Sequence, residues 1–343
     1  MLSVFGPLAW AGDTLRIATY NTELSRDGPG LLLRDIRNGR DPQVTAVIEV
    51  IRALGPDILV LQNFDFDAGH AAASALQGAL GAAGLDMPHM FLRAPNTGLP
   101  TGLDMDGDGR TGRADDAQGH GGFRGQGGLL ILSRLPIDHA AALDFTALPW
   151  RDLPGATLPT RNAAPFPSPE AQAAQRLSSV AHWALPVATP DGPLWVLAFH
   201  ATPPVFDGPE DRNGLRNADE IRFWQVLLDG GLGPAPQARF VIAGNANIDP
   251  DRGEGRRGAI RALVNDRRVA PLTPMGHAGA NTVDWSDIGL GQRRVSYVLP
   301  SNDLRIVASG VFWPPPDNPL ADAVARASRH RPVWADIALS GAD

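Results

Sequence analysis

Short apolar runs alternate with helical patterns along most of the chain, and this alternation limits the folds that it can adopt. Ile58–Leu61 is fully apolar, which is typical of a strand covered on both faces, and it follows a helical pattern over 42–54. The same criteria predict further helices over 71–83, 217–228 and 256–264, and further strands over 15–21, 128–133, 179–187, 194–200, 240–243, 294–299, 304–312 and 332–339. Many strands with few helices predict an α/β (α+β) fold in which two packed sheets carry helices outside.

The chain shows no linker that would divide it, so residues 12–341 are predicted to form a single domain. Glycine (38 residues) and proline (31 residues) make up about a fifth of the 343 residues, against a usual ~12%. They concentrate in a Gly- and Asp-rich insertion around 84–127 and in a Pro-rich segment around 150–169. We expect the second of these to be an ordered surface loop.

The composition excludes several classes of function. A formal charge of −7 argues against a broad basic surface for long duplex nucleic acid, although a local basic site for a small acidic ligand is compatible with it. All 30 basic residues are Arg, so Schiff-base chemistry and Walker-type phosphate binding are excluded. The absence of Cys excludes thiol catalysis, zinc–thiolate sites and disulfides.

The N-terminus indicates export. Residues 1–11 (MLSVFGPLAWA) are apolar and end in Ala-Trp-Ala, which resembles the end of a signal peptide, so a secreted or periplasmic location is predicted. The alternative is an ordinary apolar extension. No window holds the ~18 consecutive apolar residues of a membrane-spanning helix.

Polar residues stand at or after the ends of the predicted core strands, where sites gather. They are Asn21, Asn63, His200, Asn245, Asn247, Ser296 and His330. In order along the chain, the segments ATYN, PDILVLQ, GGLLILSRLPI, LAFHATP, VIAGNAN, RRVSYVLPS and SRHRPVWADI resemble the endonuclease/exonuclease/phosphatase superfamily, the DNase I-like metal-dependent phosphoesterases. The resemblance implies a four-layer sandwich of two largely antiparallel sheets between helices.

The resemblance also shows what this chain lacks. The family has a Mg²⁺-holding Glu at the position of Asn63, and Asp residues at the positions of Asn245, Ser296 and Arg329. These replacements move the local charge from −4 to +1. Because Mg²⁺ needs carboxylate oxygens, whereas Asn and Ser compete poorly with water and Arg repels the ion, we expect weak or lost hydrolysis and a remaining phosphate pocket.

The resemblance assigns roles to the residues that stand at the family's site positions. Catalytic positions fall on His200, Asn245, Asn247 and His330. Substrate-binding positions fall on Asn21 and Arg329, and Arg176 is placed on a substrate-facing loop, while Asn63 and Asp65 mark a degenerate metal site. Without a carboxylate partner, His330 is expected to keep a pKa near that of a free imidazole.

The alternative to a lost metal site is that the chain still binds a divalent metal ion through other carboxylates. Glu23 shares a strand face with Asn21, and Asp65 with Asn63, so Glu23, Asp65, Asp249 and Asp284 could rebuild an acidic cluster that holds Mg²⁺ or Mn²⁺. The opposing interpretation is that Asp65 and Asp67 cap the helix that begins near Ala71.

A second metal signal lies in the insertion. Asp104, Asp106, Asp108 and Asp115, with the carbonyl of Arg110, fit the calcium-loop pattern D-x-D-x-D-G-x₅-[DE]. Glycines and a proline around it exclude the paired helices of a calcium sensor, so we expect a structural Ca²⁺ clip; the alternative is an acidic turn that binds nothing.

Three hypotheses about function follow. The first is a phosphoesterase relative that retains a pocket for a phosphate-containing small molecule or phosphoester. The second is an active phosphomono- or phosphodiesterase that uses the displaced carboxylates, and the third is a calcium-ordered extracellular binding module. The sequence does not identify the substrate or the oligomeric state.

Overall fold

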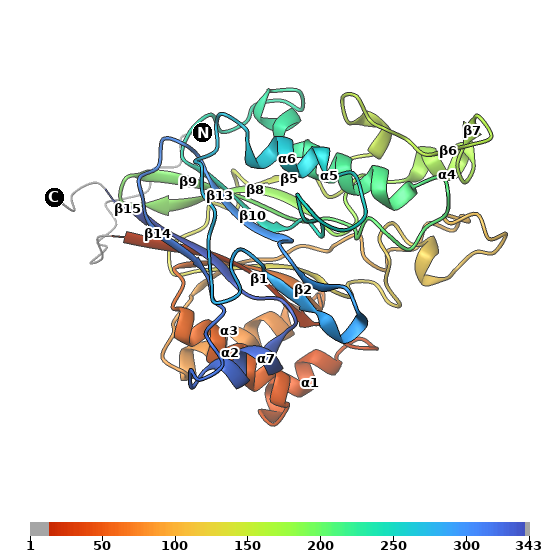
Figure 1. Cartoon of the computed structure of the whole chain (residues 1–343). Coiled ribbons are helices and arrows are strands. Elements are labelled where there is room, and N and C mark those ends of the chain that lie inside the picture. Colours follow the sequence, from red (N-terminus) through yellow and green to blue (C-terminus); the bar gives the residue numbers. More distant parts are fainter. Residues whose placement is uncertain (1–13, 340–343) are drawn as a thin grey trace.

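The computed structural model describes residues 14–339, which form two packed β-sheets between two layers of helices (Figure 1). The predicted signal-peptide segment 1–11 lies outside the described residues. The first sheet has the strand order β14-β15-β1-β2-β4-β3 and the second has the order β13-β10-β9-β8-β5. The predicted four-layer fold is confirmed.

Both sheets are mainly antiparallel, but each has one parallel pair at its centre. In the first sheet β1 pairs in parallel with β2, and in the second β9 pairs in parallel with β10. The strands of the first sheet are β1 (Thr14–Leu24), β2 (Ile58–Phe64), β3 (His89–Phe91), β4 (Gly128–Ser133), β14 (Ile306–Val311) and β15 (Val333–Ala338). Those of the second are β5 (Leu143–Asp144), β8 (His182–Thr189), β9 (Gly192–His200), β10 (Phe240–Asn245) and β13 (Ser296–Pro300).

Helices make the parallel connections and cover the outer faces (Figure 1). On the first sheet pack α1 (Leu31–Asn38), α2 (Pro42–Leu54), α3 (Ala71–Ala82) and α7 (Ala321–Ala327), and on the second pack α5 (Arg212–Leu228) and α6 (Gly258–Val264). The sequence encodes the ends of α2: the Asp41 carboxylate accepts from the Val44 amide, and Gly55 ends the helix at φ 60°. None of the described helices is both long and apolar enough to cross a lipid bilayer.

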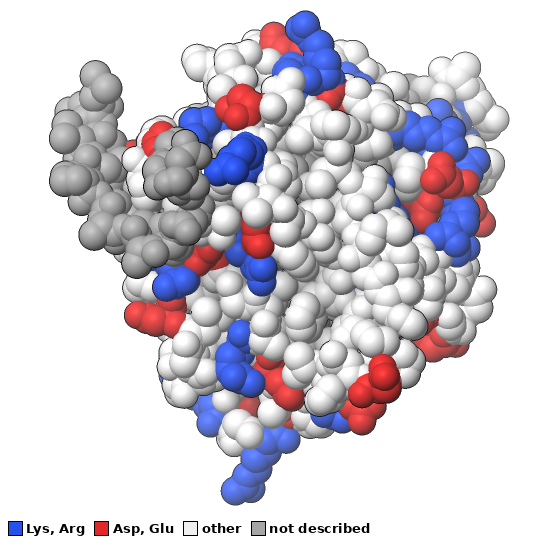
Figure 2. Space-filling view, turned by 60° about the vertical axis from the view of Figure 1, so that its left-hand side comes forward, with Lys and Arg blue, Asp and Glu red and all other residues white. Residues whose placement is uncertain are grey.

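The loops carry little regular structure. The insertion contains a 3-10 turn (Ala114–Asp116), and the Pro-rich segment holds a second 3-10 turn (Trp150–Asp152) and a small hairpin of β6 (Thr160–Arg161) and β7 (Ala164–Pro165), followed by α4 (Pro169–Ala174). A hairpin of β11 (Val283–Trp285) and β12 (Gly291–Arg293), joined by a 3-10 turn (Ser286–Ile288), stands beside the sheets. On the face shown in Figure 2, basic and acidic side chains are interspersed around uncharged surface.

Candidate functional site: a strand-end pocket

The pocket forms where the core between the two sheets turns polar. Val196 and Ala198 of β9 face the opposite sheet, and His200 continues this inward row because strand side chains repeat with period two. The same alternation puts Asn245 at the end of β10 and Asn21 near the end of β1. Both parallel pairs therefore deliver polar side chains to one edge of the sandwich.

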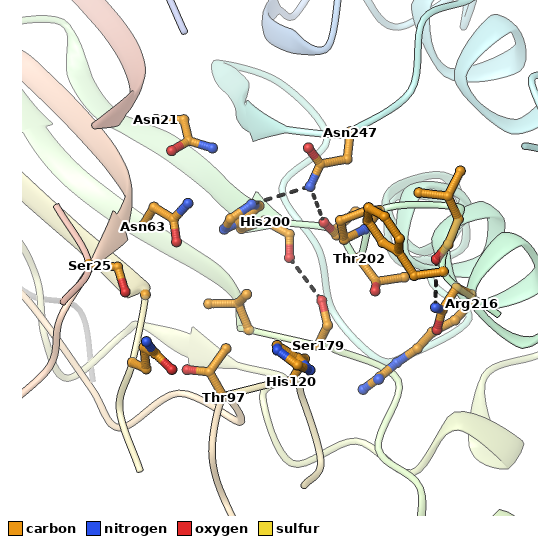
Figure 3. A pocket seen from close by; sticks show the side chains of 18 of the residues that line it. Asn21, Ser25, Asn63, Thr97, His120, Ser179, His200, Thr202, Arg216 and Asn247 are labelled. Atoms are coloured by element: carbon orange, nitrogen blue, oxygen red, sulfur yellow. Dashed lines mark hydrogen bonds between the residues drawn. The ribbon is translucent and has the colours of Figure 1, made fainter. Parts of the chain in front are cut away.

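A cavity of about 660 Å³ opens at this edge. Figure 3 shows Asn21, Asn63, His200 and Asn247 on one side of it and Thr97, Ser179 and His120 on another. The structure thus brings together six of the nine residues predicted for the pocket and the degenerate metal site: Asn21, Asn63, His200, Asn247, Arg329 and His330. Asn245 does not line the cavity but is fully buried beside His200 and Asn247.

Amides contact the imidazoles of both histidines. The Nε2 atom of His330 lies 3.4 Å from the amide nitrogen of Asn21. The Nε2 atom of His200 lies 3.5 Å from that of Asn245 and 3.4 Å from that of Asn247. Asn247, at φ 53°, also donates to the carbonyl of Ala201 at 2.8 Å, which fixes its side chain.

Both histidines are neutral near pH 7. Burial lowers the pKa of His200 to about 3, and the neighbouring His330 lowers it further. Burial likewise lowers the pKa of His330 to about 4, although the charge of Glu23 opposes this shift. The expectation of an ordinary pKa for His330 is therefore wrong, because it considered the missing carboxylate and not the desolvation of the ring.

Ser296 and His200 carry buried side-chain atoms without a partner among the described residues. His200, Asn245 and Ser296 are register neighbours across β9, β10 and β13, so their side chains share one face of the second sheet. The Nδ1 atom of His200 and the Oγ atom of Ser296 are both buried, and neither has a hydrogen-bond partner among the described residues. Ser296 therefore does not orient the imidazole of His200.

Arg329 does not contribute a free positive charge, because it is paired with Glu23. The Nε and Nη2 atoms of Arg329 lie 2.9 and 2.7 Å from Oε1 of Glu23. The Oε2 atom of Glu23 accepts from the Arg329 amide at 2.8 Å and from the Ser328 hydroxyl at 3.0 Å. The charge count from the sequence omitted Glu23, so the excess of positive charge is smaller than expected.

The other displaced carboxylates do not join Glu23. Asp65 accepts from the amides of Arg26 and Gly127, each at 2.9 Å. Asp249 accepts from the amides of Asp251, Arg252 and Arg294, and Asp284 accepts from Ser286 and Gln292. None of the three lines the cavity, so the acidic cluster of the alternative hypothesis is not assembled.

Asp67 caps helix α3, as one of the two interpretations of this segment predicts. Its Oδ1 and Oδ2 atoms accept from the amides of Ala71 and Ala72 at 2.8 and 2.9 Å, at the start of α3. Asp65 does not cap this helix, since its two oxygens bind the segments that flank β1 and β4.

The donors at the pocket do not fit Mg²⁺. The ion requires near-octahedral oxygen ligands and is held by carboxylates in protein sites. Among the described residues, Glu23 is the one carboxylate on a strand that lines the cavity, and both of its oxygens are engaged by Arg329 and Ser328. Amide and imidazole groups supply the remainder of this side of the cavity.

The structure places Arg176, predicted to bind substrate, outside the lining of the cavity, and a neighbouring arginine lines it instead. Arg176 donates to the side chain of Asn96 at 2.8 Å and does not line the cavity. Arg216 is buried at 6% exposure and lines the cavity with Arg212. Its Nε and Nη2 atoms donate to the carbonyls of Leu177, Gln118, Arg176 and Ser178.

The insertion holds a separate acidic cluster. Carboxylate oxygens of Asp104, Asp106 and Asp108 lie within 4.8 Å of one another, and among residues 14–339 this is the one such group of three or more. The fourth predicted ligand, Asp115, is elsewhere: its Oδ1 atom lies 2.8 Å from Nδ1 of His120, and both residues line the strand-end cavity. The cluster therefore has three of the four predicted carboxylates.

Comparison with known proteins identifies the family. The model of the endonuclease/exonuclease/phosphatase family matches residues 18–330, and the chain belongs to this family. No curated protein matches the sequence.

Solved structures share the fold at low sequence identity. A protein of this family from Beutenbergia cavernae is 22% identical, with a TM-score of 0.57 over 96% of this chain and 73% of its own. One from Leptotrichia buccalis is 15% identical, with a TM-score of 0.53 over 95% of this chain and 100% of its own. Beta toxin from Staphylococcus aureus, solved with bound magnesium ions, is 12% identical, with a TM-score of 0.50 over 94% of this chain and 99% of its own.

Proposed function

We propose that this protein binds a phosphate-containing small molecule or phosphoester in the strand-end pocket and that its Mg²⁺-dependent hydrolysis is weak or lost. The main observation in support of this proposal is that neutral amides and imidazoles occupy the ends of the central strands, while Arg329 is paired with Glu23. Amide N–H groups and arginines are donors suited to phosphate oxygens, whereas a divalent cation needs free carboxylates.

The charges around the cavity favour an anion. Arg212, Arg216 and Arg329 line it together with the carboxylates of Glu23 and Asp115. Burial, and to a smaller extent the neighbouring Arg212, lower the pKa of Arg216 to about 10. Arg216 therefore stays protonated at neutral pH. A bound phosphate oxygen would gain charge-assisted hydrogen bonds there.

We also propose that the cluster of Asp104, Asp106 and Asp108 binds Ca²⁺. Three close carboxylates supply oxygen ligands of the kind that this ion prefers, and the calcium-loop pattern would add the backbone carbonyl of Arg110. The lack of Asp115 in the cluster favours the weak affinity of a structural clip. Such an affinity suits calcium-rich surroundings, in agreement with the export that we propose from residues 1–11.

Isothermal titration calorimetry with inorganic phosphate tests the pocket. His200→Ala removes an imidazole at the centre of the amide network, so we expect phosphate binding to be lost. His139→Ala, an exposed histidine outside the cavity, is the matched control and should bind like the wild type. Unchanged binding by His200→Ala, with a melting temperature that shows an intact fold, would contradict the proposal.

A further inference from the structure

A phenylalanine at the edge of the cavity is exposed to an unusual degree. Phe206 lines the cavity, yet 90% of its surface is accessible to solvent. Its backbone has φ 70°, in the left-handed region that bulky residues rarely adopt. Exposure of the ring and the strained backbone both cost free energy, and strain of this kind persists where the surrounding structure imposes it.

The chain on both sides of Phe206 is fixed to the start of α5. The side-chain amide of Asn213 donates to the carbonyl of Val205 at 2.8 Å. The backbone amide of Asn213 donates to the carboxylate of Asp207. Both neighbours of Phe206 are therefore tied to one residue in the first helical turn, and the phenyl ring is presented from a defined loop at the cavity edge.

A second aromatic ring lines the same cavity from a different element. Trp285, at the end of β11, packs edge-to-face with His330 at a centroid distance of 5.7 Å and an interplanar angle of 87°. The cavity therefore has aromatic rings as well as the amides and imidazoles of the strand ends. Its volume of about 660 Å³ is far larger than a phosphate ion, so it has room for an organic group beside the phosphate.

We propose that the ligand is a phosphoester of a planar aromatic group, with the phosphate at the strand-end amides and the aromatic ring stacked on Phe206. This inference rests on the proposed function, because it takes the phosphate end of the pocket as given. Stacking recovers the apolar surface that Phe206 exposes, and aromatic pairs prefer offset or edge-to-face arrangements that a fixed ring can provide.

The test compares three ligands by isothermal titration calorimetry: inorganic phosphate, phenyl phosphate and cyclohexyl phosphate. We expect phenyl phosphate to bind about tenfold more tightly than phosphate. Cyclohexyl phosphate has a similar apolar group without a planar ring, so its affinity should exceed that of phosphate by about threefold or less. Phe206→Ala should reduce the affinity for phenyl phosphate to within about twofold of the affinity of the same variant for phosphate, whereas Phe206→Tyr should keep the tenfold preference for phenyl phosphate.

Val307→Ala is the matched control, because Val307 is 55% exposed and does not line the cavity. It should leave all three affinities unchanged. This inference is overturned, and the phosphate site stands, if phosphate binds but phenyl phosphate binds no more tightly. The same conclusion follows if cyclohexyl phosphate binds as tightly as phenyl phosphate, or if Phe206→Ala does not change the affinity for phenyl phosphate. If neither phosphate nor phenyl phosphate binds, the proposed function and this inference both fail.

Discussion

Glu23 and Arg329 form an ion pair in the wall of the strand-end pocket, with the Nη2 atom of Arg329 2.7 Å from Oε1 of Glu23. Burial raises the pKa of the Glu23 carboxyl, but hydrogen bonds from Arg329 and the neighbouring charges outweigh it, so the net shift is downward. Each partner therefore remains charged and cancels the other. A ligand bound at the strand ends would meet this ion pair.

Neutralising the two partners should change anion binding in opposite directions. Glu23→Gln removes a negative charge and releases Arg329, so phosphate affinity should rise about three- to tenfold. Arg329→Gln leaves an unpaired carboxylate facing the ligand, so affinity should fall about tenfold or more. Calorimetric titration measures both, with Arg326→Gln, exposed and outside the cavity, as the control. A change in the same direction for both variants would contradict the role assigned to the pair.

The buried histidines make stability depend on pH. The pKa of His330 is lowered to about 4 by burial, while an unfolded histidine titrates near ~6.5. As the pH falls, the histidine of the unfolded state therefore takes up a proton before the buried His330 does. The stability that the folded state has with His330 neutral is complete above about pH 6.5 and is lost as the pH falls towards 4.

Replacing His330 should reduce that pH dependence. The free energy of unfolding of the wild type should decrease as the pH falls from about 6.5 to 4.5. In His330→Asn this decrease should be smaller by roughly 1–2 kcal/mol. Urea denaturation at several pH values measures it. His277→Asn, which alters an exposed histidine, should keep the wild-type slope, and an equal slope for both variants would argue against a desolvated His330.

Restoring a carboxylate at position 296 should change the ionisation of His200. Ser296 shares the inward face of the second sheet with His200, and the Nδ1 atom of His200 has no partner among the described residues. Ser296→Asp supplies an acceptor and a negative charge, so the pKa of His200 should rise from about 3 by about one unit or more. Histidine NMR titration measures it. Ser296→Asn, of similar size but uncharged, should leave the pKa within about half a unit of its starting value.

Calcium should stabilise the insertion. Burial raises the pKa of Asp106, and the adjoining Asp104 and Asp108 carboxylates add to this rise, so the metal-free loop holds mutually repelling charges. About 1 mM Ca²⁺ should increase the melting temperature by several degrees, and EGTA should reverse the increase. The double variant Asp106→Asn/Asp108→Asn should not respond, while Asp322→Asn, on exposed surface, should respond normally. A wild-type melting temperature that EGTA leaves unmoved would rule the clip out.

The fold could be predicted largely from hydrophobic patterning. The buried runs of β2 and β10 and the alternation of β1 are strong local signals, and most predicted elements lie within a few residues of the observed ones. Helix α5 begins at Arg212, five residues before the predicted start at 217, because its first turn is polar and is held by tertiary contacts such as those of Arg216. Helices α1, α4 and α7 were not predicted.

The site was predicted less completely than the fold. Residues on regular strands, such as Asn21 and His200, could be located because strand register fixes the direction of a side chain. Arg216 and the pairing of Glu23 with Arg329 depend on contacts between segments far apart in sequence, which no local pattern encodes. The ionisation of His330 depends on burial, which is also a property of the assembled pocket.

Magnesium titration tests whether the strand-end pocket is unable to hold this ion, as its amides and its engaged Glu23 predict. The measurement uses Asp106→Asn/Asp108→Asn as the background, so that the acidic cluster of the insertion contributes no heat. In this background the natural pocket should give no heat above dilution. Adding Asn63→Glu, Asn245→Asp, Ser296→Asp and Arg329→Asp should create saturable binding. Saturable Mg²⁺ binding by the natural pocket, accompanied by metal-dependent release of p-nitrophenol from bis-p-nitrophenyl phosphate, would contradict the account.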